Sequence, residues 1–269
     1  MKIFVTRKIP TPGLELLKKE CTIELNPLDR VLSKKEIIKG IKGKDGLLCL
    51  LTDPIDKEVI NAEPQLKMIA SYAVGYDNID VAAATKRGIP VSNTPGVLTE
   101  TTAELTWALL FAVARRIVEG DVFTRKGKFN GWEPLLMLGQ DVTKKTLGVI
   151  GTGRIGTAFA LKSKGFDMKV LYSDEQRNKH LEKELGAKQV PLSKLLKESD
   201  FISIHVPLTK ETHHLIDEKE LRLMKKTAVL INTARGPIIN EKALIKALRE
   251  QWIFGAGLDV YEREPEISK

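Results

Sequence analysis

Strand-like apolar runs alternate with helix-like segments along this 269-residue sequence, and the alternation limits the possible folds more than any other feature. A repeated order of strand, helix and strand predicts parallel sheets joined by right-handed crossover helices. One helix should open at Ser33, where Glu36 completes a capping-box pattern. Another should span 79–86 and stop at Gly88. The strands expected in the first half are 3–6, 22–25, 46–51, 67–71 and 90–93.

The alternation restarts after residues 93–96, Asn-Thr-Pro-Gly, because proline and glycine together interrupt regular structure. The strands expected beyond this point are 146–150, 169–172, 188–190, 201–206, 228–232 and 255–259. Six strands in this pattern make a complete dinucleotide-binding sheet. We therefore predict an α/β protein of two doubly wound parallel-sheet domains. Residues 1–95 would form a flavodoxin-like domain and residues 96–269 a Rossmann dinucleotide-binding domain.

Composition argues against several classes of function. No apolar run approaches the ~18 residues of a membrane span, and residues 1–7 lack the features of a signal peptide, so we expect a cytoplasmic protein without a membrane partner. The net charge of +8 comes from scattered lysines without interleaved aromatic residues, which argues against a nucleic-acid partner.

The cysteines and histidines give no sign of a disulfide framework or a metal site. Cys21 and Cys49 both lie in apolar sequence and are expected to be buried, reduced thiols. Of the four histidines only His213 and His214 are adjacent, and no cysteine is near them, so no metal is predicted.

Residues 151–156, Gly-Thr-Gly-Arg-Ile-Gly, are the strongest local signal for a binding site. Gly-x-Gly-x-x-Gly alone is weak, but here it directly follows an expected strand and opens a helix. Gly151, Gly153 and Gly156 would then allow a tight turn, close approach of a pyrophosphate, and close packing of the helix on the sheet. The first N–H groups of that helix would hold the phosphate.

Asp174 lies eighteen positions after Gly156, at the end of the next expected strand. An acidic residue at about this spacing accepts hydrogen bonds from the ribose 2′-hydroxyl of a dinucleotide. A carboxylate there repels a 2′-phosphate, so NAD is favoured over NADP. The nearby Arg177 keeps NADP open as the less favoured cofactor, because an arginine in this region can accommodate that phosphate.

Two further segments leave the carboxyl ends of expected strands, where open α/β sheets bind their ligands. The first, 232–236, contains Arg235, whose planar guanidinium suits two-point capture of a carboxylate. The second, 257–265, contains several charged residues that would ordinarily just be solvated. Beside an arginine-bearing strand end, one of these carboxylates could instead raise the pKa of a catalytic base.

These motifs together resemble the D-2-hydroxyacid dehydrogenase family over essentially the whole chain. The matching segments are 74–80 (Val-Gly-Tyr-Asp-Asn-Ile-Asp), 146–156, 205–209 with Thr212, 232–236 and 258–265. Residues 93–104 and 132–141 look most like the glyoxylate and hydroxypyruvate reductases of that family. The resemblance implies an NAD-dependent dehydrogenase that transfers a hydride between NAD(H) and a small 2-oxoacid or D-2-hydroxyacid, with residues 1–95 as the substrate-binding domain.

The resemblance also implies roles for individual residues. Arg235 would hold the carboxylate and carbonyl of the 2-oxoacid, and Glu264 would pair with a catalytic histidine. Leu50, Val74 and Gly75 would face the substrate. Besides the three glycines, the residues expected to contact the cofactor are Thr102, Arg154, Ile155, Asp174, Val206, Pro207, Thr212, Thr233, Ala234 and Asp259.

The family's catalytic histidine lies a short way beyond the matched glutamate, and the sequence stops at Lys269, before that motif. We expect none of His180, His205, His213 and His214 to replace it, so the chain is expected to be a shortened form. This leaves a second hypothesis open, that of a catalytically impaired, NAD-binding regulatory protein on the same fold.

A homodimer is expected through the cofactor domain. The helix expected at 99–118 contains eight consecutive apolar residues, 107–114, which a helix cannot direct to one side only. The loop 127–139 contains four more, Leu-Leu-Met-Leu at 135–138, which need cover. Across a two-fold axis, each such surface could meet its own copy.

Overall fold

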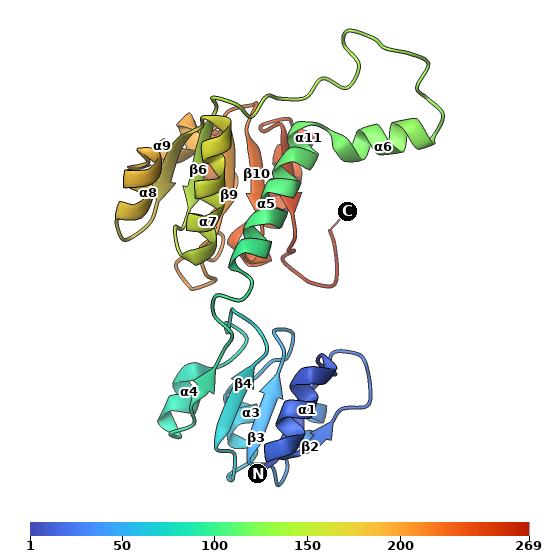
Figure 1. Ribbon diagram of the computed structural model, residues 1–269, viewed down its shortest axis with the longest axis vertical. Helices are drawn as coiled ribbons and strands as arrows, with labels where there is room; N and C mark the ends of the chain where they lie inside the picture. The colour runs from blue at the N-terminus through green and yellow to red at the C-terminus, as the bar shows by residue number, and fades with distance from the viewer. Residues whose placement is uncertain (269) are drawn as a thin grey trace. The chain divides into compact units, whose positions relative to one another are not determined.

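The computed structural model describes residues 1–268, which form two compact units that divide between Leu98 and Thr99. Both are α/β units with a parallel sheet, as the sequence predicted (Figure 1). Each is described by itself below. In the described part of the chain, no helix is long and apolar enough to cross a membrane.

The first unit is a five-stranded parallel sheet with the order β2-β1-β3-β4-β5, which is the flavodoxin-like order. Its strands are β1 (Lys2–Val5), β2 (Thr22–Leu25), β3 (Gly46–Cys49), β4 (Met68–Ser71) and β5 (Val91–Ser92). Its helices are α1 (Thr11–Glu20), α2 (Lys34–Gly40), α3 (Lys57–Asn61) and α4 (Val81–Lys86). Helices α2, α3 and α4 contribute to one apolar cluster, whereas α1 contributes to another.

Side-chain caps explain where three of the four helices of the first unit begin. The predicted capping box is present at α2, where Ser33 accepts from the Glu36 amide and Glu36 accepts from the Ser33 amide. Asp56 and Asp80 cap α3 and α4 by accepting hydrogen bonds from first-turn amides. Each cap satisfies N–H groups that have no partner within the helix.

The second unit is a six-stranded parallel sheet with the order β11-β10-β9-β6-β7-β8. In chain order this is the 3-2-1-4-5-6 arrangement of dinucleotide-binding sheets, with the strand order reversing between β6 and β9. Its strands are β6 (Thr146–Ile150), β7 (Lys169–Ser173), β8 (Lys188–Gln189), β9 (Phe201–Ile204), β10 (Val229–Asn232) and β11 (Gly255–Leu258).

Helices cover both faces of this second sheet. The α-helices are α5 (Thr99–Ala114), α6 (Ile117–Arg125), α7 (Arg154–Lys162), α8 (Lys179–Leu185), α9 (Leu192–Glu198), α10 (Glu218–Leu223) and α11 (Glu241–Arg249). Two short 3-10 helices span Ser163–Phe166 and Gly236–Ile238. Apolar residues of α5, α7 and α8 pack in one cluster, and those of α9, α10 and α11 pack in a second.

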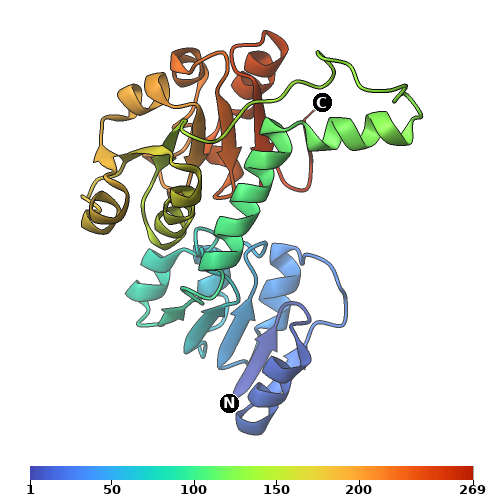
Figure 2. The same cartoon turned by 45° about the horizontal axis from the view of Figure 1, so that its top comes forward.

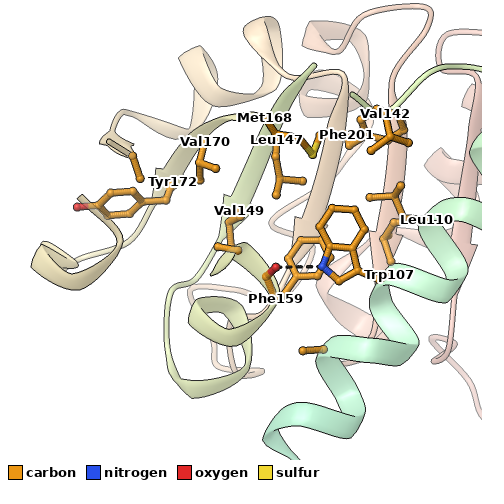
Figure 3. Close-up of a cluster of buried hydrophobic side chains, with 14 of the residues drawn as sticks. Trp107, Leu110, Val142, Leu147, Val149, Phe159, Met168, Val170, Tyr172 and Phe201 are labelled. Atoms are coloured by element: carbon orange, nitrogen blue, oxygen red, sulfur yellow. Dashed lines mark hydrogen bonds between the residues drawn. The ribbon is translucent and has the colours of Figure 1, made fainter. Parts of the chain in front are cut away.

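Trp107 of α5 anchors the first of these clusters. Its ring lies within 5.0 Å of the Phe159 ring and 5.2 Å of the Phe166 ring, centroid to centroid. Its indole Nε1 donates a hydrogen bond to the carbonyl oxygen of Phe159 (3.0 Å), so the polar atom of a buried side chain is satisfied (Figure 3). This contact attaches α5 to α7.

The prediction of one helix over 99–118 was wrong. Helix α5 ends at Ala114, Arg116 adopts a left-handed backbone conformation with φ 53°, and a separate helix α6 follows. A distant segment binds the chain at this break. The Gln140 amide donates to the Ala114 carbonyl oxygen (2.8 Å), which a continuing helix would offer to residue 118.

Two smaller expectations also need correction. Several strands end one or two residues before the predicted limit, as β3 does at Cys49 and β9 at Ile204, because the chain turns out of the sheet there. Cys49 is fully buried, and burial raises its pKa to about 12, whereas Cys21 is only half-buried. The apolar residues around Cys21 in the sequence do not enclose it.

Candidate active site

Five residues of the second unit each follow the last residue of a strand, at the same edge of the sheet. These are Gly151, Asp174, His205, Thr233 and Asp259, which follow β6, β7, β9, β10 and β11. The strands are parallel and end in register, with Ile150 beside both Ser173 and Ile204, and Asn232 beside both Ile204 and Leu258. This edge is where parallel α/β sheets bind ligands.

The turn after β6 can be built only with glycine at two of its positions. Gly151 has φ 88°, and a Cβ there would lie 2.8 Å from both Cγ1 and the backbone nitrogen of Val206. A Cβ on Gly156 would lie 2.1 Å from the carbonyl oxygen of Gly151. These glycines therefore bring helix α7 and the chain after β9 into close contact with the turn.

Gly153 differs from the other two, because nothing lies within 4 Å of the position its Cβ would take. It is the N-cap of α7, and no side chain caps that helix end. Arg154 and Ile155 follow in the first turn, where the backbone N–H groups have no partner within the helix. A cradle of this shape fits the pyrophosphate of a dinucleotide.

Asp174 is held against the glycine-rich turn. Its Oδ2 accepts hydrogen bonds from the Thr152 amide (2.6 Å) and hydroxyl (2.9 Å), and its Oδ1 accepts from the Gln176 amide (3.2 Å). Burial raises the pKa of the Asp174 carboxyl, but these hydrogen bonds outweigh it and hold the pKa below its ordinary value. The group is therefore a fixed carboxylate beside the pyrophosphate cradle.

Four more of the predicted residues lie in the loops after β9 and β10, namely Val206, Pro207, Thr212 and Thr233. Thr212 donates from its Oγ1 to the Pro207 carbonyl oxygen (2.6 Å), which closes the loop that follows Val206. Thr233 is buried, and its Oγ1 lies 2.9 Å from that of Thr106.

The Thr106 hydroxyl also bonds to the Thr102 carbonyl oxygen (2.7 Å), so that α5 is connected to the end of β10. Thr102 thus lies one helical turn before a residue that contacts a strand end.

Asn232 shapes the turn that presents Arg235. Its side-chain oxygen accepts from the Ala234 amide (3.0 Å), and its Nδ2 donates to the Arg235 carbonyl oxygen (2.9 Å). The next residue is Gly236, where a Cβ would lie 1.9 Å from the Tyr261 carbonyl oxygen. The guanidinium of the half-buried Arg235 donates to the Ala234 carbonyl oxygen (2.8 Å).

The turn after β11 carries Asp259 and Glu264, both exposed. One oxygen of Glu264 accepts from the Tyr261 amide (2.9 Å), which holds the carboxylate in its own turn. The contact between Gly236 and Tyr261 keeps this turn against the Arg235 loop. Arg235 and Glu264 are thus carried by two loops that touch each other.

Two histidine arrangements were not predicted. The centroid of the His205 ring lies 5.1 Å from that of the Phe159 ring, and its Nε2 lies 2.9 Å from Ser203 Oγ. Burial lowers the pKa of His205 to about 3, so this imidazole is neutral. His214 Nε2 lies 3.0 Å from Oε1 of Glu262. No local sequence signal indicates this pair, because the two residues are 48 positions apart.

The remaining predicted residues belong to the first unit. Leu50 follows β3 directly, and Val74 and Gly75 lie three and four residues beyond β4, the neighbouring strand. Asn78 donates to the Leu50 carbonyl oxygen (3.0 Å), and Asn93 donates to that of Val74 (2.7 Å). These amides fix both loops at one edge of the first sheet. Within residues 1–268, no cluster of metal-ligating side chains occurs.

The apolar loop beyond α6 is exposed in the part of the chain that the structure describes. Trp132 is 83% exposed, Leu135 79% and Leu138 57%. Figures 1 and 2 both show α6 projecting from the second sheet and the following loop returning in a wide arc.

Comparison with known proteins gives consistent matches. Residues 107–269 match the sequence profile of the D-isomer specific 2-hydroxyacid dehydrogenase NAD-binding domain. The chain is 57% identical over 265 residues to a glyoxylate reductase of Korarchaeum cryptofilum, covering 98% of this chain and 80% of that protein. It is 54% identical over 268 residues to a glyoxylate reductase of Thermococcus litoralis, covering 98% and 81%.

Solved structures agree with these matches. The TT0316 protein of Thermus thermophilus superposes with a TM-score of 0.91 at 44% identity, over 99% of this chain and 84% of that one. The D-lactate dehydrogenase of Aquifex aeolicus, solved with NAD and lactic acid, superposes with a TM-score of 0.87 at 35% identity, over 98% and 78%.

Proposed function

The chain belongs to the D-isomer specific 2-hydroxyacid dehydrogenase family and is an NAD-dependent oxidoreductase, and on that premise we propose that it reduces a small 2-oxoacid, glyoxylate or hydroxypyruvate. The observation that carries this proposal is that five strands of the second sheet end at one edge. Arg235 lies near that edge, two residues beyond Thr233, which directly follows β10. Relatives named as glyoxylate reductases, at 57% and 54% identity, support the choice of substrate. They lend no support to a catalytically impaired regulatory protein.

The proposed cofactor site combines the residues around the glycine-rich turn. The first N–H groups of α7, from Arg154 onward, would hold the pyrophosphate, and Asp174 would accept hydrogen bonds from the adenosine ribose. Bound NADH supplies the hydride. The residues proposed to line the rest of the cofactor are Thr102, Val206, Pro207, Thr212, Thr233, Ala234 and Asp259.

Arg235 is the proposed substrate anchor. Its guanidinium offers parallel donors that match a carboxylate, and the positive charge polarises the adjacent carbonyl oxygen as negative charge develops there. A lysine at this position would keep the charge and lose the two-point geometry. The binding of a carboxylate substrate should therefore depend on arginine itself.

Glu264 is the proposed carboxylate that keeps a proton-donating imidazole charged. We assign that imidazole to none of the four histidines. His205 is neutral and packs against the Phe159 ring, and His214 is held by Glu262. Of the other two, His180 belongs to α8, and the ring of His213 lies 4.0 Å, centroid to centroid, from the ring of His214.

The first unit is the proposed substrate-binding domain, with Leu50, Val74 and Gly75 facing the substrate. Its support is the pair of loops after β3 and β4, which Asn78 and Asn93 hold in place. Backbone amides in such fixed loops can bind a carboxylate without reorganising.

We also infer a homodimer formed through α5 and the loop around Trp132. The support is the exposure of Trp132, Leu135 and Leu138, because a single uncovered apolar loop of this kind usually marks an interaction surface. A C₂ dimer would place each loop on the same surface of its partner.

A steady-state assay tests the proposed reaction. The fall in NADH absorbance is followed with glyoxylate, hydroxypyruvate and pyruvate as competing substrates. We expect kcat/KM to be highest for glyoxylate or hydroxypyruvate. A preference for pyruvate would contradict the substrate assignment, and reduction of none of the three by a protein that includes the catalytic histidine would contradict the proposed reaction.

A further inference from the structure

We propose that Glu182 sets the preference for NAD over NADP by holding Arg177 in an ion pair, so that this arginine is withheld from a ribose 2′-phosphate. The inference rests on the placement of the adenosine ribose at Asp174 proposed above. It does not depend on which 2-oxoacid is reduced. Glu182 would therefore act on the cofactor through another side chain, as a positioning residue.

Arg177 and Glu182 form a two-point contact. Arg177 Nε lies 3.1 Å from Oε1 of Glu182, and its terminal nitrogen lies 2.6 Å from Oε2. The Glu182 side chain is 22% exposed, whereas that of Arg177 is 67% exposed. Glu182 is thus the fixed partner, and Arg177 is the solvent-facing cation that it holds.

Tyr172 fixes the position of Glu182. Its ring is fully buried in the core, and its hydroxyl lies at the outer end of the side chain (Figure 3). This hydroxyl donates to Oε1 of Glu182 (2.7 Å). The same hydroxyl accepts from the Asn178 amide (3.0 Å). A buried aromatic side chain therefore aims Glu182 at Arg177.

The same network reaches the cofactor turn. Asn178 donates from Nδ2 to the Thr152 carbonyl oxygen (3.1 Å) and to Thr157 Oγ1 (2.8 Å). Thr152 is also the residue whose amide and hydroxyl bind Asp174. A continuous set of hydrogen bonds thus runs from the proposed ribose site to Glu182 and Arg177. All residues of this hydrogen-bond network lie within residues 152–182 of the sequence.

Charge gives the network its selectivity. Asp174 alone disfavours a phosphate, and Glu182 neutralises Arg177, which lies three positions after Asp174. An arginine released from Glu182 could bind a 2′-phosphate through two hydrogen bonds, which are strong when both partners are charged. The alternative is that the ion pair only stabilises α8, where an exposed pair contributes little. Only the proposed role predicts a change in cofactor preference.

The test compares cofactor affinities of matched variants. Glu182→Gln keeps an oxygen that can accept from Tyr172 but removes the charge, and Glu182→Gln combined with Arg177→Gln also removes the cation. Glu184→Gln is the control, because it removes one carboxylate from the same helix, and Glu184 pairs with Lys164 (3.8 Å) instead. The dissociation constants of NADH and NADPH are measured by titration at low and high salt, without any turnover.

We expect Glu182→Gln to tighten NADPH about tenfold relative to NADH, an effect of about 1.4 kcal/mol. The gain should disappear in the double variant and weaken at high salt, and Glu184→Gln should leave the ratio unchanged. An unchanged ratio in Glu182→Gln, or a gain that survives the loss of Arg177, would overturn the proposal. Asp174→Ala tests the ribose placement separately, because it should weaken NADH itself, and an unaltered NADH affinity would reject that placement.

Discussion

Nε2 of His214 lies 3.0 Å from Oε1 of Glu262, and this contact joins the loop before α10 to the turn after β11. Oε2 of Glu262 accepts from the Glu241 amide (3.0 Å), and Oε2 of Glu241 accepts in return from the Glu262 amide (2.9 Å). Since Glu264 lies in the same turn, the position of that carboxylate depends on three segments that are distant in the sequence.

Glu262 should therefore make stability depend on pH. Burial raises the pKa of the Glu262 carboxyl, but hydrogen bonds from the Glu241 amide and the His214 ring lower this pKa by more than burial raises it. The pKa in the folded chain is therefore below its ordinary value. A carboxyl whose pKa is lower in the folded chain than in the unfolded chain stabilises the protein at pH values above its unfolded-state pKa. This contribution is lost as the pH falls through the folded-state pKa. We expect Glu262→Gln to unfold more easily by about 1–2 kcal/mol near neutral pH.

Urea denaturation at neutral and acidic pH measures this effect. The difference between the protein and Glu262→Gln should shrink as pH falls below about 4.5, the ordinary pKa of a glutamate. Glu266→Gln, in the same exposed turn, should show no such dependence. A deficit of the same size at both pH values would mean that the carboxylate charge is not what stabilises the turn.

The glycines of the cofactor turn should separate folding from binding. Gly153→Ala should leave the melting temperature unchanged, because its Cβ meets nothing within 4 Å, but should raise the NADH dissociation constant at least tenfold by filling the cradle. Gly156→Ala should instead lower the melting temperature, because its Cβ would lie 2.1 Å from the Gly151 carbonyl oxygen. Thermal melts and NADH titrations of both variants test this. Normal NADH binding by Gly153→Ala would show that the pyrophosphate lies elsewhere.

Sequence reasoning located the strands, with several ends one or two residues off, because periodicity and spacing are local properties. The alternation of strands and helices predicted two parallel sheets, and the spacing from Gly156 predicted the acidic residue Asp174 at the end of β7. Residues that immediately follow strands converge in any parallel sheet, so much of the candidate cofactor site could be listed without a structure.

Contacts between distant segments could not be predicted in the same way. The hydroxyls of Thr106 and Thr233 meet across 127 positions, and no periodicity records that pairing. The break after Ala114 was missed because Ile117 and Val118 extend the apolar sequence beyond Arg115 and Arg116, while the Gln140 amide that binds the Ala114 carbonyl lies 26 residues further on. The fixed positions of His214 and Glu262 were missed for the same reason.

The exposed loop beyond α6 should control assembly. We expect a dimer at low micromolar concentration with an interface above ~2,000 Å² in total, as obligate dimers have. Leu135→Glu should shift it to monomer, because a charge would be buried against an apolar partner surface. Sedimentation velocity checks this, with Leu16→Glu, an exposed leucine of α1, as control. A dimer that survives Leu135→Glu would remove the loop from the interface.

The binding of oxamate, an unreactive 2-oxoacid analogue, to the NADH-saturated protein tests most directly whether Arg235 is the substrate anchor. Calorimetric titration of the protein and of Arg235→Lys separates substrate capture from cofactor binding, since no proton or hydride is transferred. We predict that Arg235→Lys weakens oxamate binding by about a hundredfold, or about 2.7 kcal/mol, and leaves the NADH dissociation constant within about twofold. Equal oxamate affinity in the two proteins would contradict the account, because Arg235 would then only shape its loop.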